Sequence, residues 1–284
     1  MSITEQKSIY VITRFLLPSL TKSERRAAEY LLANGPKVAD MTLAEYAEMA
    51  DSSQTSVLRF CSRLGVGGFS ELREQLLMSK DNGGSDMVSE VSAVDTMSEI
   101  LEKVFSYHIQ SLKDTLALVS EQYDLALQAL AAAPTIHFFG LGDAVVPGQM
   151  ASIKFRRVGV ESSVLSDPDM QVITACHMKK GEVAVAVSHT GRTRPIIQAM
   201  RYAKEAGATT ICVTAMEKSP LIKYCDIKLF TAAVDLSVGR DLVARRIAEQ
   251  AILEALYLGV ITKVHPDYRD RLRKIAAAVE HNKM

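Results

Sequence analysis

The chain has 284 residues, which is enough for two domains that each bury a hydrophobic core. Lysine plus arginine and aspartate plus glutamate both total 33, so no net charge favours nucleic acid or membrane, and any polyanion site must be local. The four cysteines are widely spaced and form no Cys-x-x-Cys pair, which is typical of free thiols in a reducing compartment. No apolar run approaches the roughly 18 residues of a membrane span, and no signal-peptide pattern opens the chain. We therefore expect a cytoplasmic protein with no membrane partner.

The first 80 residues carry helix signals only. Capping boxes open the first two predicted helices, and apolar residues at helical spacing mark the third. The predicted helices begin at residues 21, 42, 54 and 71 and end, in the same order, at residues 34–36, 50, 64 and 78. Residues 1–80 are therefore expected to form an all-α domain.

The second and third of these helices are joined by the tight turn Asp51-Ser52-Ser53, an arrangement typical of a helix-turn-helix. The third helix has no acidic residue, and Ser53 as its N-cap places polar side chains at the end that meets base edges. Glutamine can read adenine, and arginine can read guanine or bind phosphate. The residues expected to contact DNA are Ser53, Gln54, Thr55, Ser56, Arg59 and Arg63. The alternative is a three-helix bundle with no DNA-binding role.

A polar, glycine-rich stretch predicts a linker over residues 81–95, before a second domain of residues 96–284. That domain opens with two helices, one over residues 97–119 and one over residues 123–133. Short apolar runs then alternate with helical segments, which predicts βαβ units around a parallel sheet. The predicted strands are residues 136–140, 160–165, 183–187, 209–214 and 227–230, and a long helix follows over residues 242–261.

The segment Glu182–Met200 carries the clearest binding signal. A buried β-branched strand stops at a hydroxyl-rich turn with a central glycine, and Pro195 suits the first residue of a helix. Backbone N–H groups at a helix start, together with hydroxyl donors, bind phosphate. The residues expected to do so are Ser188, His189, Thr190, Gly191, Arg192 and Thr193. No Gly-Lys-Ser/Thr sequence follows, so this is no nucleotide P-loop. The alternative is an ordinary N-cap, which needs only one hydroxyl.

Both halves together resemble the RpiR family of bacterial transcriptional regulators, over nearly the whole chain. The matching segments are residues 49–60, 64–73, 139–142, 188–193, 219–221 and 246–248. The resemblance implies a helix-turn-helix domain followed by a sugar-isomerase (SIS) domain, an α/β fold with a parallel sheet flanked by helices that senses phosphosugars. It also implies that the loop after the first strand, with Gly140 and Gly142, lines the sugar. Two positions depart from the family pattern: Ala144, where relatives usually carry serine, and Arg245, where serine is frequent.

Because SIS domains also occur in aldose–ketose isomerases, the alternative function is a sugar-phosphate isomerase that carries a helix-turn-helix domain. Isomerisation needs a general base, and the candidates are Glu249, Glu254, His177 and His189. Arg192 counts against this function, because many such enzymes carry glutamate in the phosphate loop and arginine cannot act as a base.

Two further kinds of site are excluded by spacing. A dinucleotide fingerprint at Gly140-x-Gly142 lacks its third glycine, which is Val145. The pair Cys176-His177 has no further ligand at metal-binding spacing. We therefore expect no metal and no cofactor.

These patterns predict a DNA-binding transcriptional regulator of sugar metabolism that is not an enzyme. Its expected partners are a double-stranded DNA operator and a phosphorylated sugar or sugar acid bound in the SIS domain. Helix-turn-helix proteins commonly bind DNA as dimers. The helices over residues 97–133 and 242–261 are apolar enough to supply subunit contacts, so we expect a homo-oligomer, either a dimer or a tetramer.

Overall fold

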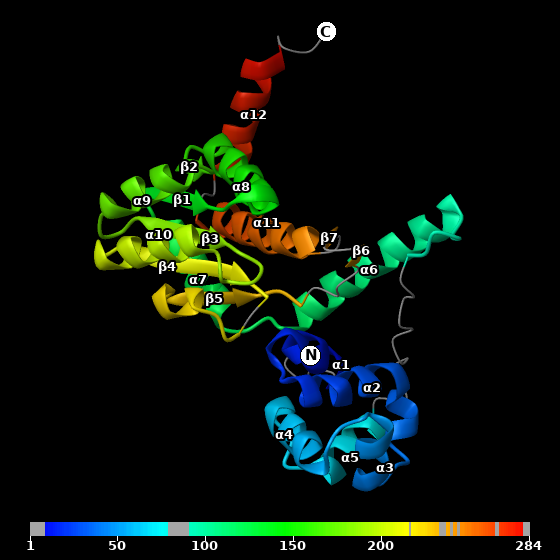
Figure 1. Cartoon of the computed structure of the whole chain (residues 1–284). Coiled ribbons are helices and arrows are strands. Elements are labelled where there is room, and N and C mark those ends of the chain that lie inside the picture. The colour runs from blue at the N-terminus through cyan, green and yellow to red at the C-terminus, as the bar shows by residue number, and fades with distance from the viewer. Residues whose placement is uncertain are drawn as a thin grey trace. The chain divides into compact units, whose positions relative to one another are not determined.

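The computed structural model describes residues 9–78, 91–215, 217–232, 237–238, 241–242, 245–264 and 267–280. Two compact units make up the chain (Figure 1): one consists of residues 1–118 and 232–244, the other of residues 119–231 and 245–284. The predicted fold class is confirmed, with a helical N-terminal region and a parallel sheet flanked by helices. Much of the predicted linker, residues 81–90, lies outside the described residues, so the domain limits drawn from the sequence stay a prediction.

The first unit is helical in its N-terminal part. Its helices are α1 (Ile9–Leu16), α2 (Lys22–Val38), α3 (Leu43–Met49), α4 (Gln54–Leu64), α5 (Phe69–Met78) and α6 (Met97–Ala117). The capping boxes at Thr21 and Thr42 form as predicted: each hydroxyl accepts from the backbone of a glutamate whose carboxylate accepts in return. The predicted end of α2 is a kink instead, because Asn34 leaves helical geometry and the chain then makes one more turn around Pro36. The sequence did not predict α1.

Helices α1 to α5 share one core, which fixes the two helices of the predicted DNA-binding motif. Tyr46 of α3 is fully buried and donates its hydroxyl to the carbonyl of Ala27 in α2, at 2.6 Å. On α4, Val57, Phe60 and Leu64 face this core at helical spacing. The opposite face of α4 is thereby left to solvent.

The second unit contains a five-stranded parallel sheet with the order β2-β1-β3-β4-β5. Its strands are β1 (Thr135–Phe139), β2 (Glu161–Leu165), β3 (Val183–Val187), β4 (Thr209–Thr214) and β5 (Ile227–Phe230), close to the predicted bounds. Its helices are α7 (Gln122–Ala132), α8 (Val145–Arg157), α9 (Pro168–Cys176), α10 (Arg194–Glu205), α11 (Arg245–Val264) and α12 (Tyr268–Val279). A short antiparallel pair, β6 (Ser237–Val238) and β7 (Asp241–Leu242), precedes α11, so the last long helix begins later than predicted.

Helices cover both faces of the sheet (Figure 1). Side chains of α7, α8 and α11 pack on one face, and those of α9 and α10 pack on the other. Every residue of β3 is buried, which explains why this strand is an unbroken apolar run in the sequence.

The topology singles out one edge of the sheet. From β1 the chain moves to β2 on one side, and then crosses back to β3 on the other side of β1. Ligands of open parallel sheets bind outside the carboxyl ends of the strands at such a switch point. The loops that follow β1 and β3, residues 140–144 and 188–193, both lie there.

Candidate functional site

The loop after β3 is held by backbone hydrogen bonds on both sides. The carbonyl of His189 accepts from the Ala215 N–H and the Thr214 hydroxyl, both at 3.0 Å, and the carbonyl of Gly191 accepts from Leu221 N–H at 3.1 Å. Loop 188–193 is therefore fixed against the segment that follows β4.

Gly191 is required by both geometry and space. Its φ is +59°, a left-handed conformation that costs other residues energy, and a Cβ there would lie 2.2 Å from Ser219 Oγ. In the neighbouring loop, Gly142 has a φ of +60°, and a Cβ on Gly140 would lie 2.6 Å from the Ala144 carbonyl oxygen. Both loops of the switch point thus depend on glycine for their path.

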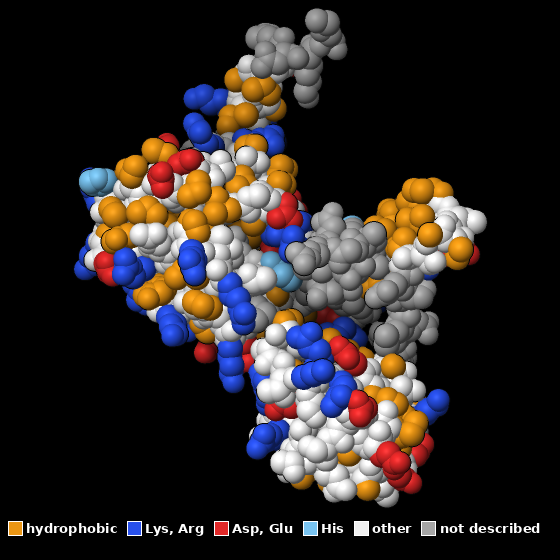
Figure 2. Space-filling view, in the orientation of Figure 1, with side chains coloured by type: hydrophobic (Ala, Val, Ile, Leu, Met, Phe, Trp, Pro, Cys, Tyr) orange, Lys and Arg blue, Asp and Glu red, His pale blue; other side chains and the backbone are white. Residues whose placement is uncertain are grey.

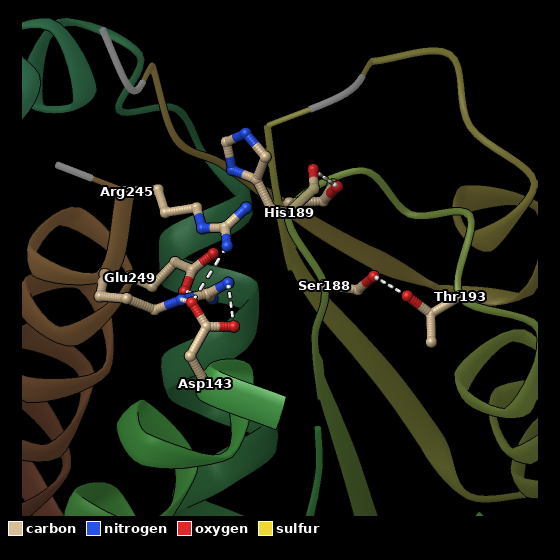
Figure 3. Close-up of polar contacts among 8 residues, drawn as sticks. Asp143, Ser188, His189, Thr193, Arg245 and Glu249 are labelled. Atoms are coloured by element: carbon tan, nitrogen blue, oxygen red, sulfur yellow. Dashed lines mark hydrogen bonds and ion pairs between the residues drawn. The ribbon is translucent and has the colours of Figure 1, made fainter. Parts of the chain in front are cut away.

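The two hydroxyls of the predicted phosphate loop face each other (Figure 3). Ser188, which is buried, lies with its Oγ 3.4 Å from Thr193 Oγ1. Thr193 is the N-cap of α10, yet its side chain makes no capping hydrogen bond within the described structure. Helix α10 begins at Arg194, so Pro195 is its second residue rather than its first. The hydroxyls are therefore not used for capping, in contrast to the ordinary N-cap alternative.

The remaining predicted phosphate residues line the exposed rim of the same turn. Thr190 Oγ1 accepts from the backbone N–H of Arg192 at 3.3 Å, and the side chains of both residues are exposed. The Arg192 guanidinium is thus on the surface beside the helix start, where it adds positive charge.

A charged cluster, absent from the sequence-based site, joins the loop after β1 to the start of α11. Arg246 binds both carboxylate oxygens of Asp143, at 2.9 and 3.1 Å, and Arg245 donates to the same carboxylate at 3.1 Å. Arg246 also pairs with Glu249, which is fully buried. Burial raises the pKa of Glu249 to about 7, although Arg246 and Arg245 oppose the shift.

The imidazole ring of His189 lies next to Arg245 of this cluster (Figure 3). Burial and the positive charges of Arg245 and Arg246 lower the pKa of His189 to about 4, so its ring is neutral near pH 7. The loop after β3 therefore contributes both a phosphate-type turn and a neutral imidazole to the same edge of the sheet.

The other candidate bases lie elsewhere. Glu254 pairs with Lys154 of α8, and the neighbouring ammonium, by its hydrogen bond, holds the pKa of that carboxyl below its usual range. His177 is exposed and follows the C-terminus of α9, whereas the loops of the switch point lead into helix N-termini. Of the four candidates, only Glu249 and His189 share a location.

Within the described residues no group of three or more His, Cys, Asp or Glu side chains is arranged to hold a metal ion. None of the described helices is both long and apolar enough to cross a membrane.

The predicted DNA-reading helix is α4. Its N-cap Ser53 accepts from the Ser56 N–H at 3.1 Å, and Gly65 ends the helix in the left-handed conformation, with φ +82°. Asp51 also has a positive φ, which aspartate tolerates, and it accepts a hydrogen bond from Arg26. The turn between α3 and α4 is thus fixed by the side chains of α2.

The predicted DNA-contacting residues do not all face solvent. Gln54, Thr55 and Arg59 are exposed with Ser53, and Ser56 is half-buried. Arg63 is also half-buried, and its guanidinium donates to the carbonyl and hydroxyl oxygens of Ser19 at 2.8 and 2.7 Å. That side chain is therefore used to hold α4 against the segment that precedes α2. The sequence analysis missed Leu58, an exposed apolar residue on the same helix.

Comparison with known proteins identifies both parts of the chain. Residues 14–82 match the profile "Helix-turn-helix domain, rpiR family", and residues 129–258 match the profile "SIS domain". Two curated relatives are each 32% identical: an HTH-type transcriptional regulator of Caldanaerobacter subterraneus subsp. tengcongensis, TTE0211, which is itself uncharacterised, and HexR of Pseudomonas aeruginosa. The alignments cover 91% of this chain, and 92% and 91% of those proteins.

Among solved structures, the Vibrio vulnificus NanR protein complexed with ManNAc-6P is similar in fold, with a TM-score of 0.60 and 21% identity, over 95% of this chain and 98% of NanR. The chain belongs to the rpiR family of helix-turn-helix transcriptional regulators and is a DNA-binding regulator with a C-terminal SIS domain.

Proposed function

We propose that the SIS domain binds the phosphate group of a sugar or sugar acid in the loop Ser188–Thr193, and that this ligand controls DNA binding. The observation that carries the proposal is the facing pair Ser188 and Thr193, whose hydroxyls lie at a helix start without serving as its cap. Backbone N–H groups of the first turn of α10, which have no partner within a helix, add to these donors. The NanR complex with ManNAc-6P supports a phosphosugar as the class of ligand.

The test is a titration of the full-length chain with phosphosugars, with thermal unfolding as the readout. A compound that binds only the native state raises stability by RT ln(1 + [L]/Kd). Ser188→Ala combined with Thr193→Ala is expected to weaken binding about a hundredfold or more, because each charge-assisted hydrogen bond contributes about 1.5–3 kcal/mol. Thr262→Ala is the matched control, since that exposed hydroxyl bonds only to carbonyls of its own helix. If the double variant and the control bind phosphosugar with equal affinity, loop 188–193 is not the phosphate site.

We propose that α4 reads the operator through Gln54, Thr55 and Arg59, with Ser53 and Ser56 at the helix start. These residues share the face that is turned away from the core. Arg63 is left out of this set, because its guanidinium is committed to Ser19. A thymine methyl group would suit the exposed side chain of Leu58.

We propose that the protein is a regulator without isomerase activity, in the cytoplasm, since its relatives carry the names of transcriptional regulators. Isomerase activity is the second candidate, favoured by the raised pKa of Glu249. A general base must be free to accept the carbon-bound proton, whereas one oxygen of the buried Glu249 carboxylate is paired with Arg246. NMR of hexose 6-phosphates incubated with the protein would detect any interconversion, and none is expected.

We propose that α6 pairs two copies of the chain. Its buried residues are Tyr107 and the polar Ser111, Asp114 and Thr115, whereas several of its large apolar side chains are exposed. Figure 2 shows hydrophobic side chains gathered over the first half of α6. The exposed set is Met97, Leu101, Phe105, Ile109 and Leu116. A face of this kind marks an interaction surface, and Phe105→Glu should shift the sedimenting species towards monomer.

A further inference from the structure

Several buried side-chain atoms have no hydrogen-bond partner in the described part of the chain, and three of them lie between the loop after β3 and the start of α11. These three are Nδ1 of His189, Nε of Arg245 and Oε1 of Glu249. The three side chains lie in one group between the loop after β3 and the first turn of α11 (Figure 3), and Arg245 acts on the pKa of both His189 and Glu249. Buried polar atoms are nearly always paired, so a group of unpaired atoms calls for a polar ligand.

The three groups are held in place by their other atoms. One oxygen of Glu249 pairs with Arg246, and the terminal nitrogen of Arg245 bonds to Asp143. The backbone carbonyl of His189 accepts two hydrogen bonds from the end of β4. The side chains of Glu249 and Arg245 are therefore each anchored through one polar atom, and His189 is anchored through its backbone, while the buried side-chain atoms named above have no partner among the described residues.

The chemistry of these unpaired atoms selects the ligand group. Arg245 Nε–H is a donor only, Glu249 above its pKa of about 7 is an acceptor only, and a neutral imidazole nitrogen is either, depending on its tautomer. A hydroxyl both donates and accepts, so neighbouring hydroxyls can satisfy all three atoms. A carboxylate or phosphate ligand would be repelled by the negative charge of Glu249, and a metal cation would be repelled by the positive charge of Arg245.

We propose that His189, Arg245 and Glu249 form a hydroxyl-binding subsite that takes the hydroxyl-bearing carbons of the phosphosugar. This subsite rests on the proposed function, because it lies beside the phosphate loop and extends that site toward α11.

The test separates the subsite from the phosphate loop. Four probes are titrated into full-length protein: inorganic phosphate, glucose 6-phosphate, fructose 6-phosphate and 6-phosphogluconate. At least one phosphosugar is expected to bind wild type at least tenfold more tightly than inorganic phosphate. Glu249→Gln keeps the shape of the side chain and its contact with Arg246 but removes the charge. It is expected to lower the ratio of phosphosugar affinity to phosphate affinity by about a factor of ten. The affinity for inorganic phosphate should stay within twofold, which also reports correct folding of the loop.

The matched control is Glu254→Gln, which lies further along α11 and whose carboxylate pairs with Lys154. This control should leave all four affinities unchanged. If phosphate binds but no phosphosugar binds better, or if Glu249→Gln leaves the advantage intact, the subsite is wrong and the phosphate loop survives. If the variant weakens all four probes equally, Glu249 only supports the loop, and the subsite is again wrong. If none of the probes binds wild type, the proposed function itself fails.

Discussion

Burial shifts the pKa values of Glu249 and His189, which both lie near Arg245, in opposite directions, and this should be visible in the pH dependence of stability. The pKa of Glu249 rises from 4.5 to about 7 in the folded chain, and that of His189 falls from 6.5 to about 4. Each shift corresponds to roughly 3 kcal/mol. The charged groups around them are the same for both, namely Asp143, Arg245 and Arg246.

The two contributions have opposite signs. Between pH 4.5 and 7 the unfolded chain ionises Glu249 while the folded chain retains the proton, so stability falls as pH rises. Between pH 6.5 and 4 the unfolded chain protonates His189 while the folded chain does not, so stability falls as pH drops. In the shared window, about pH 4.5–6.5, the two slopes cancel, and wild type should show little pH dependence from this pair.

A single substitution at Glu249 or His189 removes the pH dependence of stability that this one residue contributes. Relative to wild type, Glu249→Gln should gain about 2 kcal/mol on going from pH 5.0 to 6.5, and His189→Asn should lose about as much. For a unit of this size that is a change in melting temperature of about 4–8 °C, in opposite directions. Scanning calorimetry of the full chain at both pH values measures it, with Glu254→Gln as the control because its pKa lies below the window. If both variants follow the wild-type profile, the two groups are not buried as described.

Four other substitutions probe the local geometry. Gly191→Ala should weaken phosphate binding and lower stability by at least about 1 kcal/mol, measured by titration and calorimetry, because its φ is +59° and its Cβ would clash. Arg59→Ala should weaken operator binding by about 1–3 kcal/mol in a gel-shift assay, whereas Arg63→Ala should mainly lower stability. Arg14→Ala should lower the free energy of unfolding by about 3–5 kcal/mol, since it leaves the buried carboxylate of Asp114 without its counter-charge and with the hydrogen bond from Gln110; retention of wild-type stability would contradict the ion pair.

Local patterns in the sequence predicted local structure well. The five strands are apolar runs bounded by turns, and the capping boxes at Thr21 and Thr42 form as expected, because the signal and the structure involve the same few residues. The path of the loop around Gly191 could also be anticipated, since a glycine between hydroxyl residues marks a close turn.

Contacts between distant residues could not be predicted in this way. Arg63 bonds to Ser19, which lies 44 residues earlier, and so a residue expected at the DNA surface is turned inward. Asp143 accepts a hydrogen bond from Arg245, about a hundred residues later, and no local sequence pattern predicts this pair. Helical periodicity correctly marked the apolar face of α6, but it does not say whether that face is buried, and in this structure part of it is exposed.

The measurement that tests the account most directly is operator binding with and without phosphosugar, in wild type and in the Ser188→Ala, Thr193→Ala double variant. At least one of glucose 6-phosphate, fructose 6-phosphate and 6-phosphogluconate should change wild-type affinity for operator DNA by about 5–150-fold. The double variant should bind the operator as wild type does when no phosphosugar is present, and should not respond at concentrations that saturate wild type. A double variant that responds at wild-type concentrations would show that the loop after β3 is not the sensor.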